Sequence, residues 1–267
     1  MEVGQNLASP TINDAPEAKP QSFFSRLMGV YFSPGETFQE IGRAPRVLIP
    51  LLCVLLLGVA TRYVLVNRIG YENMVRKEID MQSAMMEKFN MPPAAIEQAK
   101  AKAEERLKPE NALREKLKGS IGSVIGFPLI ILIAAGVFKL YSMILGASNR
   151  FKGVFSAVTF AYLAVGILGF VVLTISIYLK NPDDIDVFNP VASNLGAIMT
   201  MAGAGSSKFL TALASWIDVF GIWRIILLSI GCAAVTTKMK PGTASVPHIL
   251  LYLLAAVILS FFASFMG

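Results

Sequence analysis

Residues 153–179 have the sequence GVFSAVTFAYLAVGILGFVVLTISIYL, which contains no charged side chain. A bilayer core is spanned by about 20 apolar residues of α-helix, so this stretch predicts a transmembrane helix. Strands of this length would leave backbone groups unpaired in lipid unless they closed into a barrel, and the alternating pattern of a barrel is absent. The expected fold class is therefore all-α, as a multi-pass membrane protein.

Four other stretches have the same apolar character, so the chain is expected to have five transmembrane helices. Pro128 breaks the second of these spans, and the fourth contains the charged residues Asp218 and Arg224. The fifth opens with Pro247, which suits a first helical turn because the N–H group there has no intrahelical partner. The expected spans are residues 47–66, 120–146, 153–179, 209–236 and 247–266.

The composition agrees with a membrane protein and argues against two other classes. Charged residues make up 16% of the 267-residue chain and hydrophobic residues 54%, whereas a soluble domain is about a quarter charged. The net charge of +6 does not indicate nucleic-acid binding, because retention of Lys and Arg on the cytoplasmic side and attraction to anionic lipid account for it. We therefore expect the lipid bilayer as a partner, and no nucleic acid.

Polar and charged segments divide the chain into regions. The first 20 residues are polar and contain three prolines, so they predict a disordered tail rather than a cleavable signal peptide. Residues 67–118 carry much of the charge and predict a helical hairpin that projects from the membrane. The division is 1–20 tail, 21–45 interfacial amphipathic helices, 46–66 first transmembrane helix, 67–118 charged hairpin, and 119–267 four transmembrane helices with a loop at 180–208.

Ahead of Ser33 the sequence predicts a short amphipathic helix. Apolar residues such as Phe24 and Leu27 can share one broad face, with Arg26 off that face. This distribution is typical of a helix that lies in the membrane interface.

A second short helix is expected to begin at the sequence Ser33-Pro34-Gly35-Glu36. The Ser33 side chain can accept a hydrogen bond from the Glu36 N–H, and Glu36 can reach back, which is the pattern of a capping box. Pro34 takes the first helical position, and the helix continues through Phe38.

The first helix of the charged hairpin has apolar residues at helical spacing, namely Val75, Ile79, Met86 and Phe89. The sequence Met91-Pro92-Pro93 then ends that helix. If the chain only had to form a helical bundle, a short turn could connect the first two transmembrane helices. The apolar face is therefore interpreted as a surface that recruits a protein partner.

No catalytic, metal or cofactor site is predicted. Cys53 and Cys232 lie inside apolar stretches, without a CxxC motif. His248 is the only histidine, and there is no Gly-rich phosphate loop, Ser/His/Asp set or paired acidic motif. The hairpin methionines are expected to form an adaptable packing or partner face rather than a copper(I) site. We therefore expect no enzyme activity, no metal and no cofactor.

Four ionisable residues fall inside the expected spans: Arg62, Lys139, Asp218 and Arg224. Placing each of these side chains in the bilayer core costs roughly 2.5–3.5 kcal/mol on insertion scales, so each is expected to have a structural or functional role. Arg62 and Lys139 lie near span ends, where their side chains can reach the interface. Asp218 is expected to pair with Arg62, and Arg224 to face the bundle interior or a partner subunit. The pair could fix helix register, or it could belong to a proton or substrate pathway.

Three stretches combine in a recognisable order: VYFSPGETFQEIGRAPRVLIPLL (30–52), LGASNRFKGVFSAVTFAYLAVGILG (145–169) and WIDVFGIWRIILLSIGCAAVTTKMKPGTA (216–244). The first holds an aromatic-Ser-Pro-x-x-x-Phe motif ahead of a span. The third holds an Asp-x-Phe-x-x-Trp core that includes Phe220 and Trp223. Together they resemble the bacterial branch of the Yip (Ypt-interacting protein) domain family. The charged segment 67–118 is where this chain departs most from shorter members.

The resemblance implies an all-helical protein with five spans and a cytoplasmic N-terminus. The eukaryotic branch acts in membrane trafficking and binds Rab-type GTPases and partner membrane proteins. That role does not carry over, because the bacterial branch has no such pathway. The resemblance therefore implies a fold and a location rather than a reaction.

The distribution of basic residues favours one orientation in the membrane. The N-terminal segment and the short loops with Arg150 and Lys152, and with Lys238 and Lys240, fall on one side. By the positive-inside rule, this side is cytoplasmic. The hairpin argues the other way, but it is long, and acidic residues accompany its basic ones. We expect a cytoplasmic (inner) membrane protein with the N-terminus inside, and with the C-terminus and the hairpin outside.

Two functions fit these observations. The first is an interaction or membrane-organising module that assembles with partner membrane or envelope proteins, and it could also form a homo-oligomer. The second is a transporter or channel subunit, or an accessory to one, that uses the charges Asp218 and Arg224.

Overall fold

The computed structural model describes residues 21–182, 185, 190–204 and 207–264. The described residues form helices and turns, and the one β-type feature among them is an isolated bridge between Asn194 and Asp218. The all-α prediction is therefore confirmed. The predicted tail, residues 1–20, lies outside the described residues.

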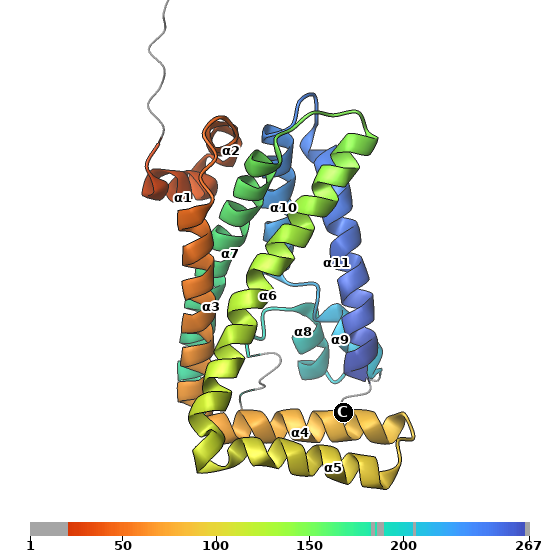
Figure 1. Ribbon diagram of the computed structural model, residues 1–267. Helices are drawn as coiled ribbons and strands as arrows, with labels where there is room; N and C mark the ends of the chain where they lie inside the picture. The colour runs from red at the N-terminus through yellow and green to blue at the C-terminus, as the bar shows by residue number, and fades with distance from the viewer. Residues whose placement is uncertain (1–20, 183–184, 186–189, 205–206, 265–267) are drawn as a thin grey trace, which may run out of the picture.

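Four helices are long and apolar enough to cross a membrane: α3 (Leu48–Ile69), α7 (Phe151–Leu179), α11 (Pro241–Ser264) and the Ile125–Ile144 part of α6 (Pro109–Ile144). A fifth apolar helix, α10 (Val219–Ala234), runs within the same bundle (Figure 1). It has 16 residues. At 1.5 Å per residue it measures about 24 Å, less than the ~30 Å of a bilayer core.

The fourth predicted span, 209–236, is wrong as a continuous helix. The chain forms α9 (Lys208–Ala214), turns at residues 215–218, and starts again as α10. The turn is closed by the Ile217 N–H, which donates to the Ala214 carbonyl at 2.9 Å. Asp218 is the reason for the break, because a short carboxylate competes for backbone N–H groups and favours the start of a helix over its interior.

Two proline positions also differ from the prediction. α6 begins at Pro109 and continues through Pro128, where a break was expected. The predicted boundary between residues 118 and 119 therefore falls inside one helix, which carries the chain from the hairpin into the bundle. α11 begins at Pro241, so Pro247 lies within the helix and not in its first turn.

α7 is the most buried helix of the bundle and contacts α3, α6 and α10. Its buried positions include the small residues Ala157, Ala161 and Ala164. Small side chains let helix backbones approach each other closely. Contact with α3 is tight, since a Cβ atom at Gly166 would lie 2.9 Å from Leu57 Cδ2.

The remaining helices cover the two ends of the bundle (Figure 1). α1 (Phe23–Phe32) and α2 (Pro34–Arg43) lie at one end, called here the N-terminal end. α4 (Tyr71–Lys88) and α5 (Pro93–Glu104), followed by the 3₁₀ turn η1 (Glu105–Leu107), lie at the opposite end, called the hairpin end. The predicted hairpin therefore exists, but it lies across the bundle instead of projecting away from it. The short α8 (Leu195–Met201) and α9 pack together on the hairpin side.

Candidate functional site

The N-terminal helix pair is held together by a buried ion pair that no sequence pattern indicated. Arg26 is completely buried, and its Nη2 donates to Glu40 Oε1 at 2.7 Å. The prediction that Arg26 lies off the buried face is therefore wrong. The chain reverses direction after Ser33 and brings Glu40 over Arg26, a contact across 14 positions. The i,i+4 spacing of ion pairs within one helix cannot detect such a contact.

The capping box predicted at the start of α2 is only partly correct. Ser33 is the residue ahead of the helix and Pro34 lies in its first turn, as predicted. The Ser33 side chain makes no cap hydrogen bond, however, and Glu36 is exposed. Ser33 also closes α1, since its N–H donates to the Gly29 carbonyl at 2.8 Å. This double use gives Ser33 a backbone (φ −144°, ψ 59°) that differs from the extended geometry of a capping residue.

The helix pair docks on α7 and α10 through aromatic side chains. Phe38 is fully buried, and a Cβ atom at Gly231 of α10 would lie 3.0 Å from Phe38 Cε1. Tyr31 donates its hydroxyl to the Ala164 carbonyl of α7 at 2.6 Å. The Tyr31 ring also contacts Trp223 of α10, with 5.9 Å between ring centroids. The motif residues Phe38 and Trp223 therefore join the N-terminal helices to the bundle.

Asp218 starts α10 and does not form the predicted ion pair. Its Oδ2 accepts from the Gly221 N–H at 3.0 Å, and its Oδ1 accepts from Ser193 Oγ at 2.9 Å. Within the described ranges, no ion pair or hydrogen bond joins Asp218 to Arg62, so that prediction is wrong. The positive end of α10 and the Ser193 hydroxyl satisfy the carboxylate instead. Phe220, from the same motif, packs half-buried against the main core.

Arg224 lies between two aromatic rings inside the bundle. Its Cζ is 5.4 Å from the ring centroid of Tyr162 on α7 and 5.7 Å from that of Tyr252 on α11. Tyr252 is itself held in place, because its hydroxyl donates to the Trp216 carbonyl at 2.5 Å. The guanidinium makes no hydrogen bond to any part of the chain that the structure describes. Arg224 faces neighbouring helices, as expected, while its aromatic neighbours come from distant segments that the sequence did not connect to it.

The two other intramembrane charges lie on long helices. Lys139 Nζ, near the end of α6, donates to the Asn149 carbonyl at 2.9 Å in the loop before α7. Its side chain therefore reaches toward the end of the bundle, in the manner expected of a snorkelling lysine. Arg62 is half-buried on α3.

The face of α4 assigned to a partner is largely used inside the hairpin. Val75 is 2% exposed and Ile79 is 8% exposed, and both pack against Ala103 of α5. These two side chains are therefore not available to a partner, which corrects the prediction. Met86 is half-buried, and Phe89 is 53% exposed at the hairpin turn. The exposed surface of the hairpin includes polar and charged residues of α4 and α5, together with Phe89 at the turn.

The hairpin is also tied to distant parts of the chain by lysine ammonium groups. Lys77 Nζ donates to the Ile185 carbonyl at 3.0 Å, and Lys88 Nζ donates to the Ser264 carbonyl at 3.3 Å. The first bond holds the segment after α7, and the second holds the end of α11. These two bonds add to the attachment of the hairpin through α3 and α6.

Basic residues in or directly beside three connections gather at the N-terminal end. All of them are exposed, and they are Arg43, Arg46, Arg150, Lys152, Lys238 and Lys240. The connections are those between α2 and α3, between α6 and α7, and between α10 and α11. This end of the bundle therefore carries an excess of positive charge.

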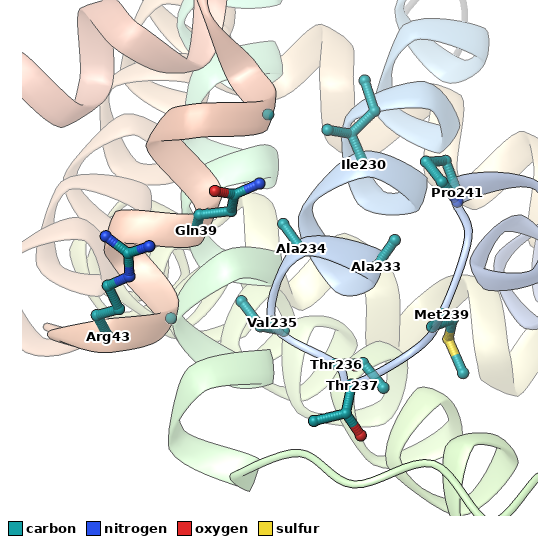
Figure 2. A pocket seen from close by; sticks show the side chains of 12 residues that line it. Gln39, Arg43, Ile230, Ala233, Ala234, Val235, Thr236, Thr237, Met239 and Pro241 are labelled. Carbon is teal, nitrogen blue, oxygen red and sulfur yellow. The ribbon is translucent and has the colours of Figure 1, made fainter.

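A cavity of about 560 Å³ opens at the same end, between α2 and the last turn of α10. Figure 2 shows Gln39 and Arg43 on the α2 side, with Ala234 and Val235 on the α10 side. The chain that leads to α11 adds further lining residues, of which Pro241 is the first of that helix. No sequence pattern indicated this cavity, because its two walls are separated by most of the chain.

Cys232 and His248 meet inside the bundle, with Sγ and Nε2 3.4 Å apart. The His248 ring stacks on Phe138, with 5.5 Å between ring centroids, and both Cys232 and His248 are buried. Over the described ranges, no group of three or more His, Cys, Asp or Glu side chains is placed to hold a metal ion. The contacts of these two residues are those of core packing.

Comparison with known protein families gives a match over most of the chain. The family described as the Yip1 domain matches residues 28–264, a range from α1 to the end of α11 that includes the charged hairpin. No curated protein and no solved structure matches the chain.

Proposed function

Because this chain belongs to the Yip1 domain family, we propose that it is an interaction or membrane-organising module of the bacterial branch of that family. In this proposal it assembles with partner membrane or envelope proteins, or with further copies of itself, and it is not an enzyme. The observation that carries the proposal is where the polar groups lie. Apolar helices form the middle of the molecule, while basic loops cover one end and a charged helical hairpin covers the other.

We further propose that the chain crosses the bilayer five times. α10 runs in the bundle with the four longer helices (Figure 1), and the short helix α9 supplies the depth that α10 lacks. The polar turn between them is supported by the bonds of Asp218 to Gly221 and Ser193. Irregular backbone at membrane depth is tolerated where protein groups satisfy it.

The orientation we propose places the N-terminal end in the cytoplasm and the hairpin outside, in a cytoplasmic (inner) membrane. The basic residues of the N-terminal end lie in short connections, where the positive-inside rule has its strongest effect. The hairpin carries basic residues too, but acidic ones pair with them, for example Arg106 with Glu78 at 2.9 Å. Its net field is therefore weak. α11 ends on the hairpin side, so the C-terminus is also placed outside.

The hairpin is the part proposed to recruit the partner. Val75 and Ile79 are used internally, which makes the hairpin a stable platform, and its outer face on α5 carries exposed charged residues. Glu97 and Lys102 are exposed on α5. A partner that reads this platform would do so through charge and hydrogen bonds, which set specificity and association rate at protein interfaces.

The test exchanges charges at the hairpin without changing the net charge of the protein. The variant Glu97→Lys, Lys102→Glu is compared with Glu36→Lys, Arg46→Glu at the opposite end, where both residues are also exposed. Tagged protein is purified from its native membrane in mild detergent, and the stoichiometry of co-purifying proteins is measured. The expected result is that a stoichiometric partner is lost from the hairpin variant and kept in the control.

Retention of every stoichiometric partner by the hairpin variant would contradict this role of α5. Single cysteines at Gln98 and Lys238 test the orientation separately. An impermeant maleimide added to intact cells is expected to label Gln98→Cys and not Lys238→Cys.

One observation favours a transporter or channel subunit as a second candidate. The half-buried Arg224 guanidinium lies between two tyrosines, without a hydrogen-bond acceptor among the described residues, so an anion could occupy that position. Ile222, which is 50% exposed on the same helix, reports on water access there. Labelling of Ile222→Cys by a polar reagent would support this candidate, and complete protection would argue against it.

A further inference from the structure

The cavity at the N-terminal end combines three properties that need a common explanation: its depth in the membrane, its charge and its shape. Its walls come from the end of α2 and the end of α10, and one rim residue, Pro241, is the first residue of α11. α3 begins at Leu48 and α7 at Phe151 on the same end. The cavity therefore lies where the apolar helices stop, which is the level of lipid headgroups.

The charged groups around the cavity are positive. Arg43 lines it, and this exposed guanidinium has no hydrogen bond or ion pair with any described residue. Lys238 and Lys240 alternate in sequence with the lining residues Thr237, Met239 and Pro241, so both are attached to its rim.

The acidic groups of α2 do not cancel this charge. Glu40 is bound to Arg26, Glu36 is exposed, and neither carboxylate lines the cavity. No Asp or Glu occurs in the connections before α3, before α7 and before α11. The start of α11 at the rim adds a helix dipole of the same sign.

The shape of the cavity separates a polar side from an apolar one. Figure 2 places Gln39 and Arg43 on one side, and Ile230, Ala233 and Ala234 on the other. Its volume of about 560 Å³ is within the range of small-molecule sites. A phosphate group would meet donors on the α2 side, and an attached glycerol or acyl chain would meet the apolar wall.

We propose that this cavity binds the phosphate of an anionic phospholipid headgroup, with Arg43 as its main ligand and Lys238 and Lys240 as supporting charges. A guanidinium suits phosphate because it offers several N–H groups in one plane. The interfacial depth favours a lipid over a free phosphate as the source. The site goes beyond the proposed role in partner assembly and does not depend on which membrane face the cavity meets.

The experiment measures binding of dihexanoyl-phosphatidylglycerol to the purified full chain in mild detergent, by native mass spectrometry and by the shift in thermal unfolding temperature. Arg43→Gln and the double variant Lys238→Gln, Lys240→Gln are each expected to weaken binding about tenfold or more, the effect of losing a charged hydrogen bond. Arg46→Gln and the double variant Arg150→Gln, Lys152→Gln are the controls. They remove the same number of positive charges, one and two, from the same end of the bundle. The lipid affinity of these controls is expected to stay within about twofold of that of the parent protein.

A further variant separates the cavity from surface charge. Ala234→Phe fills the apolar wall and keeps every charge, so it is expected to weaken lipid binding as much as Arg43→Gln does. Its folding is checked by monodispersity and by its unfolding temperature without lipid. If Ala234→Phe is misfolded, Ala233→Val serves as a smaller filling variant.

Three results would overturn the proposal. Equal weakening by the control variants would assign binding to surface charge alone. Equal binding of dihexanoyl-phosphatidylcholine would exclude recognition of an anionic headgroup. Competition by inorganic phosphate at the same concentration as the lipid would make free phosphate the ligand.

Discussion

The ion pair between Arg26 and Glu40 makes a quantitative prediction about the N-terminal helices. Arg26 is completely buried and Glu40 is 19% exposed, and the bond between them is 2.7 Å long. Arg26 Nε and Nη1, and Glu40 Oε2, have no hydrogen-bond partner among the residues that the structure describes. The two charges therefore depend on each other, with little help from their surroundings.

The expected cost of removing one partner follows from what the other keeps. Arg26→Met leaves a carboxylate that is partly hydrated and still accepts the Gln21 N–H at 3.2 Å, so we expect a loss of about 3 kcal/mol in docking free energy. Glu40→Met leaves a fully buried guanidinium, so we expect about 5 kcal/mol. The double variant has no unpaired charge and is expected within about 1 kcal/mol of the parent.

Docking of α1 can be followed by fluorescence, because Trp223 on α10 contacts Tyr31 on α1. With Trp216 replaced by Phe, the emission of Trp223 reports on that contact alone. Guanidinium titration of the four proteins in detergent gives the docking free energies and their coupling. Glu36→Gln, at an exposed carboxylate of α2, is the matched control and is expected to change the free energy by less than about 0.5 kcal/mol.

The reasoning is refuted if both single variants cost less than about 1 kcal/mol and their effects add in the double variant. Additivity would mean that the two charges do not interact in the docked state. The aromatic contacts of Tyr31 and Phe38 would then hold the helix pair on their own.

Three further predictions follow from contacts of α1 and α10. Gly231→Ala places a methyl group against Phe38 and is expected to lower the unfolding free energy by about 1–3 kcal/mol, which chemical denaturation can measure; a more stable variant would contradict the close contact. Asp218→Ala is expected to cost about 1–2 kcal/mol through loss of a helix cap, while Asp218→Asn, an equally good cap, is expected to cost less than about 0.5 kcal/mol in thermal unfolding; equal losses would show that the charge matters. Burial raises the pKa of the Tyr31 hydroxyl. The neutral hydroxyl therefore contributes its full stabilisation below the pKa of the unfolded state, about 10, and this stabilisation is lost as pH rises through the pKa of the folded state. Trp223 fluorescence is therefore expected to report α1 release at alkaline pH, and Tyr31→Phe is expected to remove this dependence.

The sequence predicted the helical class and the four long spans, because these depend on composition over long windows. It did not predict the break at residues 215–218, because the residues around Asp218 are so apolar that one carboxylate hardly lowers the mean hydropathy of the segment. The break also depends on Ser193, which lies in another segment. The hydropathy of one segment cannot predict a contact with a residue of another segment.

The site residues show the same division between local and long-range information. Ser33 and Pro34 mark the turn between α1 and α2, as their local pattern indicates. The partners of Arg26 and Arg224 could not be identified, because each meets side chains that are distant along the chain. Val75 and Ile79 have the correct spacing for one helical face, but spacing does not tell whether that face meets another helix of the chain or a separate protein.

The bond between Lys88 and the Ser264 carbonyl joins positions 176 residues apart. During synthesis the hairpin leaves the ribosome long before α11 does, so its free end has no bundle to rest on while most of the later helices are inserted. Contacts between distant positions form slowly, because the loop between them must close first. The attachment of Lys88 to the end of α11 is therefore expected to form late in biogenesis, because it requires α11 to be complete.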